Sequence, residues 1–351
     1  MEHVAIDLGG RESQICVRSA AGAIVLETRC KTRELPNFLK TREPSRVVVE
    51  TCAESFMVAD AALELGHEIR VVPATLVPAL GVGSRKTKND KRDCRILSEA
   101  SCRIDLPSVH IPSAQSRDRK TMMSMHDVLV ASRTAMVNAV RGWMRGQAVR
   151  CSSGAVETFP TRVREALEGE VLPSHIERVL GAIDALTTQI RETVREIERV
   201  AKSDAACRLL MSMPGVGPIT SVAFASTLDQ VARFPDAHKV ESYLGLVPGE
   251  NSSSDRQQRL SITKAGCSRM RWLLVQAAWS ARRTAPADPM VVWSLEVEKR
   301  RGKRMALIAL ARKMAGILFA MWRDTEVYDP TVGAKVTAAP EAKIETVAAA
   351  S

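Results

Sequence analysis

The sequence predicts an α/β domain followed by helical domains, and three observations support this fold class. The chain has 351 residues, which is enough for two or three domains with buried cores. In its first third, short apolar runs rich in β-branched residues alternate with segments of helical periodicity. Further along, long stretches that interleave charged and apolar residues replace the short runs. We therefore expect domains at 1–112, 113–203 and 204–326, with a tail over 327–351.

The first domain is expected to alternate strands and helices. Gly66 and Pro73 stand where one helix and one strand are expected to stop. The strands are expected at 3–8, 14–19, 24–28, 46–49 and 68–72, and the helices at 33–41, 53–65 and 88–103. This order, with three strands first and then helix and strand in alternation, matches a ribonuclease-H-like fold.

The rest of the chain is expected to be helical. Two long periodic stretches, 115–150 and 173–202, predict an antiparallel helical hairpin or a coiled-coil arm. A proline- and glycine-rich break at 213–218 precedes a small helical domain. Its tryptophans occupy apolar helical positions and are expected in the core: Trp272, Trp279, Trp293 and Trp322. Residues 329–351 are rich in Ala, Pro, Thr and Val without periodicity, which predicts disorder.

The composition indicates what kind of molecule the protein binds and where in the cell it is located. The 50 Lys and Arg against 40 Asp and Glu give a net charge of +10, which fits a polyanion such as nucleic acid. Aromatic residues make up only 4%, so base-stacking platforms are not expected to dominate. The eight cysteines form no C-x-x-C pair, which argues against a zinc site. Without a signal peptide or an uncharged apolar run of about 18 residues, we expect a cytoplasmic protein that spans no membrane.

Four acidic residues stand where they could share a site. Asp7 and Glu50 close two predicted strands, and Asp90 and Asp93 lie three apart on a predicted helix, so these two share a face. Carboxylates are the ligands that Mg²⁺ prefers, and two such ions can act on one phosphodiester. The alternative to a metal site is that the strand-end acids are turn residues and that the helix acids form surface ion pairs with neighbouring lysines. In a ribonuclease-H-like fold, acids at the first strand, the fourth strand and the last helix are where metals bind.

Three consecutive serines, Ser252 to Ser254, follow Pro248 in what we expect to be a polar loop. Such a run is usually a solvated turn. A serine can also attack a DNA phosphate and conserve its bond energy in a covalent link, provided that nearby positive charge assists it. Arg256, Arg259 and Lys264 could supply that charge.

Further residues are candidates for nucleic-acid contact. The turn at 214–218 could hold a phosphate on the backbone N–H groups of Gly215 and Gly217, or could simply join two helices. The basic candidates are Lys86, Lys88 and Lys91 beside the acids, Arg256 near the serines, and Lys264, Arg269 and Arg271 at a helix start. A basic run at 299–304 is usually a solvated face, but it could also touch nucleic acid.

Several of these motifs resemble one family. Ala5-Ile6-Asp7, Val49-Glu50-Thr51 and Asn89-Asp90-Lys91-Arg92-Asp93 resemble the acidic motifs of the DEDD transposases, the recombinases of bacterial insertion sequences related to the Piv DNA invertase. The blocks at 214–220, 233–234, 243–248, 252–253 and 262–266 resemble that family's C-terminal transposase domain. The order and spacing agree from about residue 4 to residue 323.

The resemblance implies a fold and a reaction. The N-terminal domain would be RuvC-like, with Asp7, Glu50, Asp90 and Asp93 holding Mg²⁺. Ser253, with Ser252 as the fallback, would attack DNA and form a phosphoserine link. The two groups would form a composite site, shared between domains of one subunit or of two subunits. The sequence departs from the family pattern where Ser254 replaces a glycine and Cys94 replaces an alanine, and we expect little effect from the small Cys94.

The same resemblance implies partners. Double-stranded donor and target DNA would be chosen by a structured non-coding guide RNA that pairs with both. The long central helices would join a homodimer or homotetramer. Two other functions stay open: a metal-dependent, structure-specific RuvC-like endonuclease that needs the acids but not the serine, and a non-catalytic nucleic-acid-binding relic. A tyrosine recombinase is disfavoured, because Tyr243 lies in an apolar run and Tyr328 at the edge of the tail.

Overall fold

The chain forms two compact units, Met1–Pro112 and Ser113–Ser351. The computed structural model describes residues 1–77, 90–168, 171–253 and 256–331, and at positions 90, 250–253 and 256–259 it describes the backbone alone. Two predicted site residues, Lys86 and Lys88, lie outside the described residues, and so does Ser254, which replaces the family's glycine. The division between the units falls where the sequence changes from short runs to long periodic stretches.

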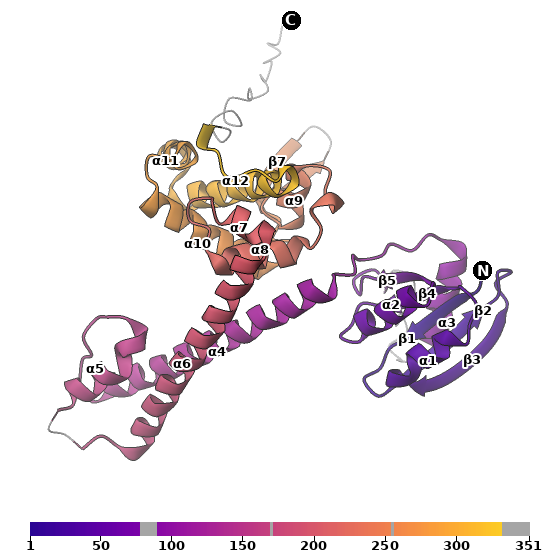
Figure 1. The fold of residues 1–351 in the computed structure, drawn as a ribbon, viewed down its shortest axis with the longest axis horizontal. Helices are drawn as coiled ribbons and strands as arrows, with labels where there is room; N and C mark the ends of the chain where they lie inside the picture. The colour runs from indigo at the N-terminus through magenta and orange to yellow at the C-terminus, as the bar shows by residue number, and fades with distance from the viewer. Residues whose placement is uncertain (78–89, 169–170, 254–255, 332–351) are drawn as a thin grey trace, which may run out of the picture. The chain divides into compact units, whose positions relative to one another are not determined.

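The first unit is an α/β domain (Figure 1). Its described elements are β1 (His3–Asp7), β2 (Glu12–Arg18), β3 (Ile24–Lys31), a 3-10 helix (Thr32–Glu34), α1 (Leu35–Lys40), β4 (Arg46–Glu50), α2 (Ser55–Glu64), β5 (Glu68–Val72) and α3 (Asp90–Arg103). The strands form one sheet in the order β3-β2-β1-β4-β5. β1 pairs with β2 in antiparallel and with β4 in parallel orientation, and β5 continues the parallel half.

Both faces of this sheet are covered by helices. Successive side chains of a strand point to opposite faces, so Val4 and Ile6 pack with α1 and α2 on one face. Ala5 and Val48 pack on the other face against Cys94 of α3. The strands and helices predicted for this unit are present in the predicted order. Its assignment to the RuvC-like folds stays a prediction.

The second unit is mostly helical. Its described elements are α4 (Ala114–Gly146), a 3-10 helix (Val156–Thr158), α5 (Phe159–Ala166), α6 (Ser174–Ser203), α7 (Ala205–Leu210), α8 (Pro218–Leu228), a 3-10 helix (Val231–Arg233), α9 (Ala237–Tyr243), β6 (Pro248–Ser253), β7 (Arg256–Ile262), α10 (Ser268–Thr284), α11 (Pro289–Arg301) and α12 (Lys303–Asp324). We refer to α7–α12 with β6 and β7 as the helical body. The α4–α6 pair, with α5 at its far end, is the arm (Figure 1).

The arm is an antiparallel helical hairpin. Near the helical body, Met123 of α4 and Ile197 of α6 belong to one large core. At the far end, Val140 of α4 and Leu180 of α6 pack with Phe159 of α5 in a separate core. Since α4 leaves the first core and α6 returns to it, the two helices run in opposite directions. The hairpin was predicted, whereas a supercoiled geometry stays a prediction.

One helix of the helical body meets the length and hydropathy of a membrane span. Within α12, the most apolar 18-residue window has a mean hydropathy of 1.6. In the structure 61% of that window is buried, with Leu310, Met314 and Leu318 in the core. The core helix of a folded domain passes the same test, so this single helix is weak evidence for a membrane protein.

The prediction that the tryptophans are core residues is wrong for two of them. Trp272 is 59% exposed and Trp279 is 41% exposed. They lie seven residues apart on α10 and so share its outward face. The buried face of α10 is formed by smaller residues, among them Ala277 and Ala281, because the backbone of Gly215 packs closely against it. Trp293 and Trp322 are half-buried, and Trp322 packs against the core as predicted.

The first residues of the predicted tail are held to the helical body. The backbone N–H of Tyr328 donates to Ser212 Oγ at 2.9 Å, and its hydroxyl donates to Asp288 at 2.9 Å. Tyr328, the residue directly before the stretch assigned to disorder by composition, is thus held by its hydrogen bonds to Ser212 and to the partly buried Asp288. The remainder of the predicted tail, 332–351, lies outside the described residues.

Candidate active site

The first two predicted acids stand side by side at one edge of the sheet. β1 and β4 are parallel, and Ile6 is in register with Val49. The next residues, Asp7 and Glu50, therefore close neighbouring strands at the same level. Both carboxylates are partly exposed. By strand alternation they lie on the sheet face that α3 covers.

Helix α3 brings the third acid to this face. The buried Cys94 thiol donates to the Ala5 carbonyl at 3.2 Å and to the Gln14 carbonyl at 3.3 Å. Burial raises the pKa of this thiol, so it stays a neutral donor. Asp93, the residue before it, is thereby held beside β1, the strand that ends in Asp7. The small Cys94 side chain is fully buried in this contact, and its little effect on activity stays a prediction.

Ion pairs from β3 fix the position of α3. Arg95 Nη2 donates to Glu27 Oε2 at 2.7 Å, and Lys91 Nζ lies 3.3 Å from the same oxygen. The hydrogen bond from Arg95 is the largest cause that lowers the pKa of Glu27 to about 2. On the next strand, Arg18 Nε donates to Ser98 Oγ at 2.9 Å. These contacts hold the acid-bearing end of α3 against the sheet.

We expect Glu27→Gln to loosen α3 in a pH-dependent way. Because the pKa of Glu27 is lowered on folding, its stabilising contribution is present above its ordinary pKa of about 4.5 and is lost as the pH falls toward 2. The expected difference from wild type is about 1 kcal/mol at pH 7, since the pair is partly exposed. Hydrogen exchange of the α3 amides, measured on both proteins at pH 7 and pH 3, checks this. A difference that grows at pH 3 would contradict the assignment.

The acids are of the type that binds a divalent ion, but the described side chains are not arranged as a metal site. Carboxylate oxygens suit Mg²⁺, and Asp7, Glu50 and Asp93 come from elements that meet on one sheet face. Among the side chains that the structure describes, no group of three or more His, Cys, Asp or Glu is arranged to hold a metal ion. The side chain of Asp90, at the first residue of α3, is not among them. Each of the three described acids already has an interaction partner in the protein.

The serine segment is a β-hairpin and not the loop that was predicted. Ser252 pairs with Gln257 and Ser253 with Arg256, between antiparallel β6 and β7. The prediction failed because this stretch carries few of the β-branched or aromatic residues by which strands are recognised. Ser253 therefore stands at the outer end of its strand, next to the undescribed positions 254–255.

Two motif glycines bring the segments that flank the hairpin together. Gly245 has φ +68°, and a Cβ there would meet the backbone of Ala265. Gly266 has φ +67°, and its Cβ would meet the Tyr243 carbonyl oxygen. Arg271 Nη1 donates to the carbonyls of Leu244 at 3.1 Å and Gly266 at 3.3 Å. The motif blocks at 243–248 and 262–266 thus pack on each other and fix the base of the hairpin.

The basic residues predicted to contact nucleic acid differ in their surroundings. Lys264 is exposed, with φ +57°. Arg269 pairs with Asp127 of α4, with Nη2 to Oδ1 at 2.8 Å, which ties the arm to α10. Arg271 is engaged with carbonyls as described above, and Lys91 pairs with Glu27. For Arg256 only the backbone is described.

The glycine turn at 214–218 joins α7 to α8. A Cβ on Gly215, whose φ is +84°, would lie 2.8 Å from the backbone nitrogen of Ala281. The packing of α10 therefore accounts for this glycine. Gly217 is the N-cap residue of α8, and no atom lies within 4 Å of the position that its Cβ would take. A helix-joining turn thus describes the position of Gly215, while a phosphate contact at Gly217 stays a prediction.

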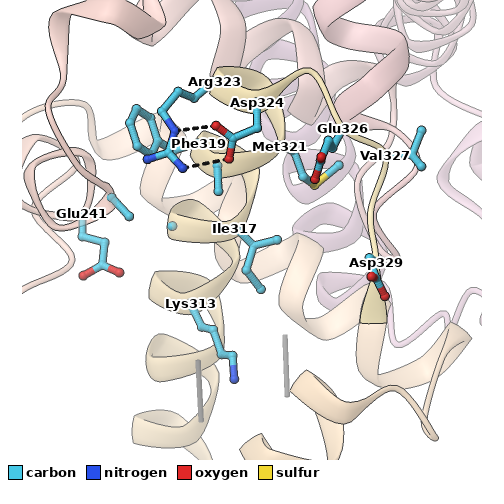
Figure 2. A pocket seen from close by; sticks show the side chains of 13 residues that line it. Glu241, Lys313, Ile317, Phe319, Met321, Arg323, Asp324, Glu326, Val327 and Asp329 are labelled. Atoms are coloured by element: carbon cyan, nitrogen blue, oxygen red, sulfur yellow. Dashed lines mark hydrogen bonds and ion pairs between the residues drawn. The ribbon is translucent and has the colours of Figure 1, made fainter. Parts of the chain in front are cut away.

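A cavity of about 270 Å³ lies between α9, α12 and the segment after α12 (Figure 2). Within it Lys313 places its Nζ 4.7 Å from the centre of the Trp293 ring, and burial lowers the pKa of this lysine. At its other end Arg323 pairs with Asp324 at 2.7 Å. None of the predicted site residues lines this cavity, so we do not assign it to the chemistry.

Comparison with known proteins bears on the class of this chain. Residues 4–147 match a family model of DEDD-type IS110 transposases, described as Transposase. Residues 207–290 match the model Transposase IS116/IS110/IS902 family. The acids on the first sheet lie in the first match, and the hairpin and its glycines in the second.

Full-length relatives agree with the family models. The transposase for insertion sequence element IS1111A of Coxiella burnetii is 26% identical over 333 residues, covering 92% of this chain and 90% of the relative. The "Probable family 20 transposase" of Pseudomonas aeruginosa is 27% identical, with 94% and 99% covered. The transposase for insertion sequence element IS1328 of Yersinia enterocolitica is 26% identical, with 93% and 98% covered.

By these matches the chain is similar to insertion-sequence transposases in both its first unit and its helical body. More particularly, the two family models that match it are those of DEDD-type IS110 transposases and of the IS116/IS110/IS902 transposases. The family implies DNA binding and the use of divalent metal ions. Transposases are typically cytoplasmic, which is the location that the sequence predicts.

Proposed function

We propose that this transposase cuts and rejoins DNA through a phosphoserine intermediate, with Ser253 as nucleophile and the four acids as metal ligands. The observation that supports the acid site most directly is the register of β1 and β4, which places Asp7 and Glu50 side by side under α3. The hairpin whose base is fixed by Gly245 and Gly266 supports the role of Ser253. A nucleophile reacts faster when its backbone holds it in position.

The acids have a charge-balancing role in this proposal. Asp7, Glu50, Asp90 and Asp93 would hold divalent ions, with Mg²⁺ as the proposed metal. When bound, the ions would neutralise charge on the phosphodiester. The protein itself orients the carboxylates, through the strand register at Asp7 and Glu50 and through the contacts of α3 at Asp93.

The proposed step at Ser253 conserves the phosphodiester. The serine oxygen bonds to the DNA phosphorus, and the bond from that phosphorus to a deoxyribose oxygen breaks. The hydroxyl proton lost by the serine is balanced by protonation of the leaving oxygen. Attack on the phosphoserine by a DNA hydroxyl then rejoins the strands. Lys264 and Arg256 would stabilise the extra negative charge on the phosphorus.

The proposed partners are donor and target double-stranded DNA, a structured guide RNA and further copies of the chain. The net charge of +10 supports binding to either nucleic acid. In a guided system, base pairing chooses the sequence, so the protein needs to recognise backbone and shape. A homodimer or homotetramer through the arm is the proposed assembly.

Covalent trapping tests this function. Full-length protein, Mg²⁺, RNA from the flank of the element and labelled DNA across its junction are incubated, denatured and separated on a gel. We expect a protein–DNA adduct that Ser253→Ala abolishes. Ser261→Ala, an exposed serine on the partner strand β7, serves as the matched control and should leave the adduct intact.

The other outcomes of this experiment separate the alternatives. An adduct lost in Ser252→Ala but kept in Ser253→Ala would move the nucleophile by one residue. DNA cut without an adduct, still dependent on Asp7, would overturn the serine mechanism. It would favour the RuvC-like endonuclease, which the arrangement of the acids alone also supports.

A further inference from the structure

A pocket at the outer end of the arm carries an unbalanced positive charge. It has a volume of about 420 Å³ and lies at the end of α4. Its lining consists of Asn138, Arg141, Met144, Arg145, Val149, Arg150 and Cys151. The three arginines are exposed, and the lining contains no carboxylate. The prediction of function from the sequence did not use these residues.

The backbone turn after α4 creates the pocket. α4 ends at Gly146, and Ala148 adopts a left-handed conformation with φ +57°. The Val149 N–H then donates back to the Met144 carbonyl at 3.0 Å. This closed turn brings Arg150 to the same hollow as Arg145 of the last helical turn.

The pocket also holds one arginine in place. The Arg141 guanidinium carbon lies 5.3 Å from the centre of the Phe159 ring, and Phe159 is fully buried in the arm core. A cation over an aromatic face is attracted to it. Arg141 is therefore oriented before any ligand arrives, which lowers the entropy lost on binding.

The charge arrangement is unfavourable without a ligand. Arg141 and Arg145 are four residues apart on α4, where like charges repel. Neither these two nor Arg150 has a carboxylate partner within the described residues, and the sequence contains no Asp or Glu from 128 to 156. Other arginines of the arm are paired, for example Arg164 with Glu177 at 2.6 Å. The helix dipole favours a cation in the last turn of α4, but this accounts for Arg145 alone.

We propose that this pocket, the arm pocket, binds phosphate groups of a nucleic-acid backbone. Arginine matches phosphate in charge and geometry, and the rest of the lining carries no negative charge that would repel a phosphate. The inference rests on the proposed function in one respect, that the protein acts on nucleic acid. It assigns a contact to the outer end of the arm, far along the chain from the acids and from Ser253.

The salt dependence of binding tests the arm pocket. The variant is Arg141→Ala/Arg145→Ala in the full chain, and the matched control is Arg191→Ala/Arg195→Ala. The control pair is also exposed and four residues apart on α6, and it removes the same charge, but Glu192 and Glu196 stand beside it. Binding of a junction DNA duplex and of the flanking RNA is measured separately between 50 and 300 mM salt, without Mg²⁺ so that cleavage does not interfere.

We expect the arm-pocket variant to lower the slope of log K against log salt. Two lost phosphate contacts correspond to a decrease of about 1.8 for duplex DNA or about 1.4 for single-stranded RNA. The nucleic acid whose slope changes is the natural ligand of the arm. The control variant should change neither slope. Unaltered thermal unfolding of both variants establishes that they are folded, and Arg150→Ala provides a second variant outside the helix.

Two results would overturn the proposal. Unchanged slopes for both nucleic acids would exclude phosphate contacts at the arm. Equal changes in the arm-pocket and control variants would show a general charge effect in place of a site. Neither result bears on covalent trapping, which tests the proposed function with Ser253 and is read independently.

Discussion

We expect Asp7→Asn to slow DNA cleavage by about 100-fold or more, the size of effect seen when a charge-stabilising group is removed from an active site. Asparagine keeps the size of the side chain but loses the negative charge that a divalent ion requires. β1 is hydrogen-bonded on both sides, to β2 and to β4, so the backbone at Asp7 should not move. Single-turnover cleavage of labelled junction DNA measures the rate.

A second acidic residue of the same sheet provides the control for this experiment. Glu12 is an exposed carboxylate at the start of β2, 3.7 Å from Arg29. Glu12→Gln removes the same charge at a position outside the proposed site, and the cleavage rate should stay within about twofold of wild type. DNA binding should be kept in both variants. If Asp7→Asn cleaved DNA within tenfold of wild type, the acids would lose their proposed role.

The sequence was sufficient to predict the first unit because its signals are local. β-branched runs and helical periodicity give the strands and helices of this domain, and the strand order follows from a small set of allowed connections. The position of Asp7 and Glu50 at strand ends follows from the same runs. The sequence alone could not show that the two acids lie side by side. That placement depends on the pairing of β1 with β4, between residues more than 40 positions apart in the chain.

The hairpin shows why part of the site could not be predicted. The strands around Ser253 are polar, and their β-structure depends on the packing of Gly245 and Gly266 at the base. Both glycines appear in the sequence as parts of separate motifs, with no indication that they meet. The sequence also could not show that Arg271 donates to backbone carbonyls, because these carbonyls belong to the same separate motifs. Its position at a helix start suggested a phosphate contact instead.

The exposed tryptophans and the arm pocket show a second limit. Periodicity identifies an apolar helix face but does not decide which face a neighbour will bury, so Trp272 and Trp279 were assigned to the wrong side of α10. The arm pocket had a signal in the sequence, namely the long stretch without Asp or Glu between 128 and 156. The sequence alone does not show that the arm-pocket arginines lie together. They do so because the turn at Ala148 brings Arg150 next to α4.

We expect Gly215→Ala to destabilise the helical body by about 4 kcal/mol, the sum of a strained backbone conformation and a steric overlap. The φ of +84° is unfavourable for alanine, and the added Cβ would lie 2.8 Å from the Ala281 nitrogen and 3.0 Å from its Cβ. The Ala281 nitrogen and the Ala277 carbonyl oxygen, which the Cβ would also meet, belong to the backbone of α10, so they move only if the helix moves. A loss of this size is a large part of the stability of an ordinary domain.

The tryptophans allow this unit to be measured by itself. All five, Trp143, Trp272, Trp279, Trp293 and Trp322, lie in the second unit, so denaturant unfolding followed by tryptophan fluorescence reports on it alone. Gly302→Ala is the control, because Gly302 also has a positive φ of +79° but no atom within 4 Å of its Cβ position. The control should lose about 1–3 kcal/mol from strain alone. If Gly215→Ala lost no more stability than Gly302→Ala, contact with α10 would not be the reason for this glycine, and a phosphate contact at its backbone N–H would again be a candidate.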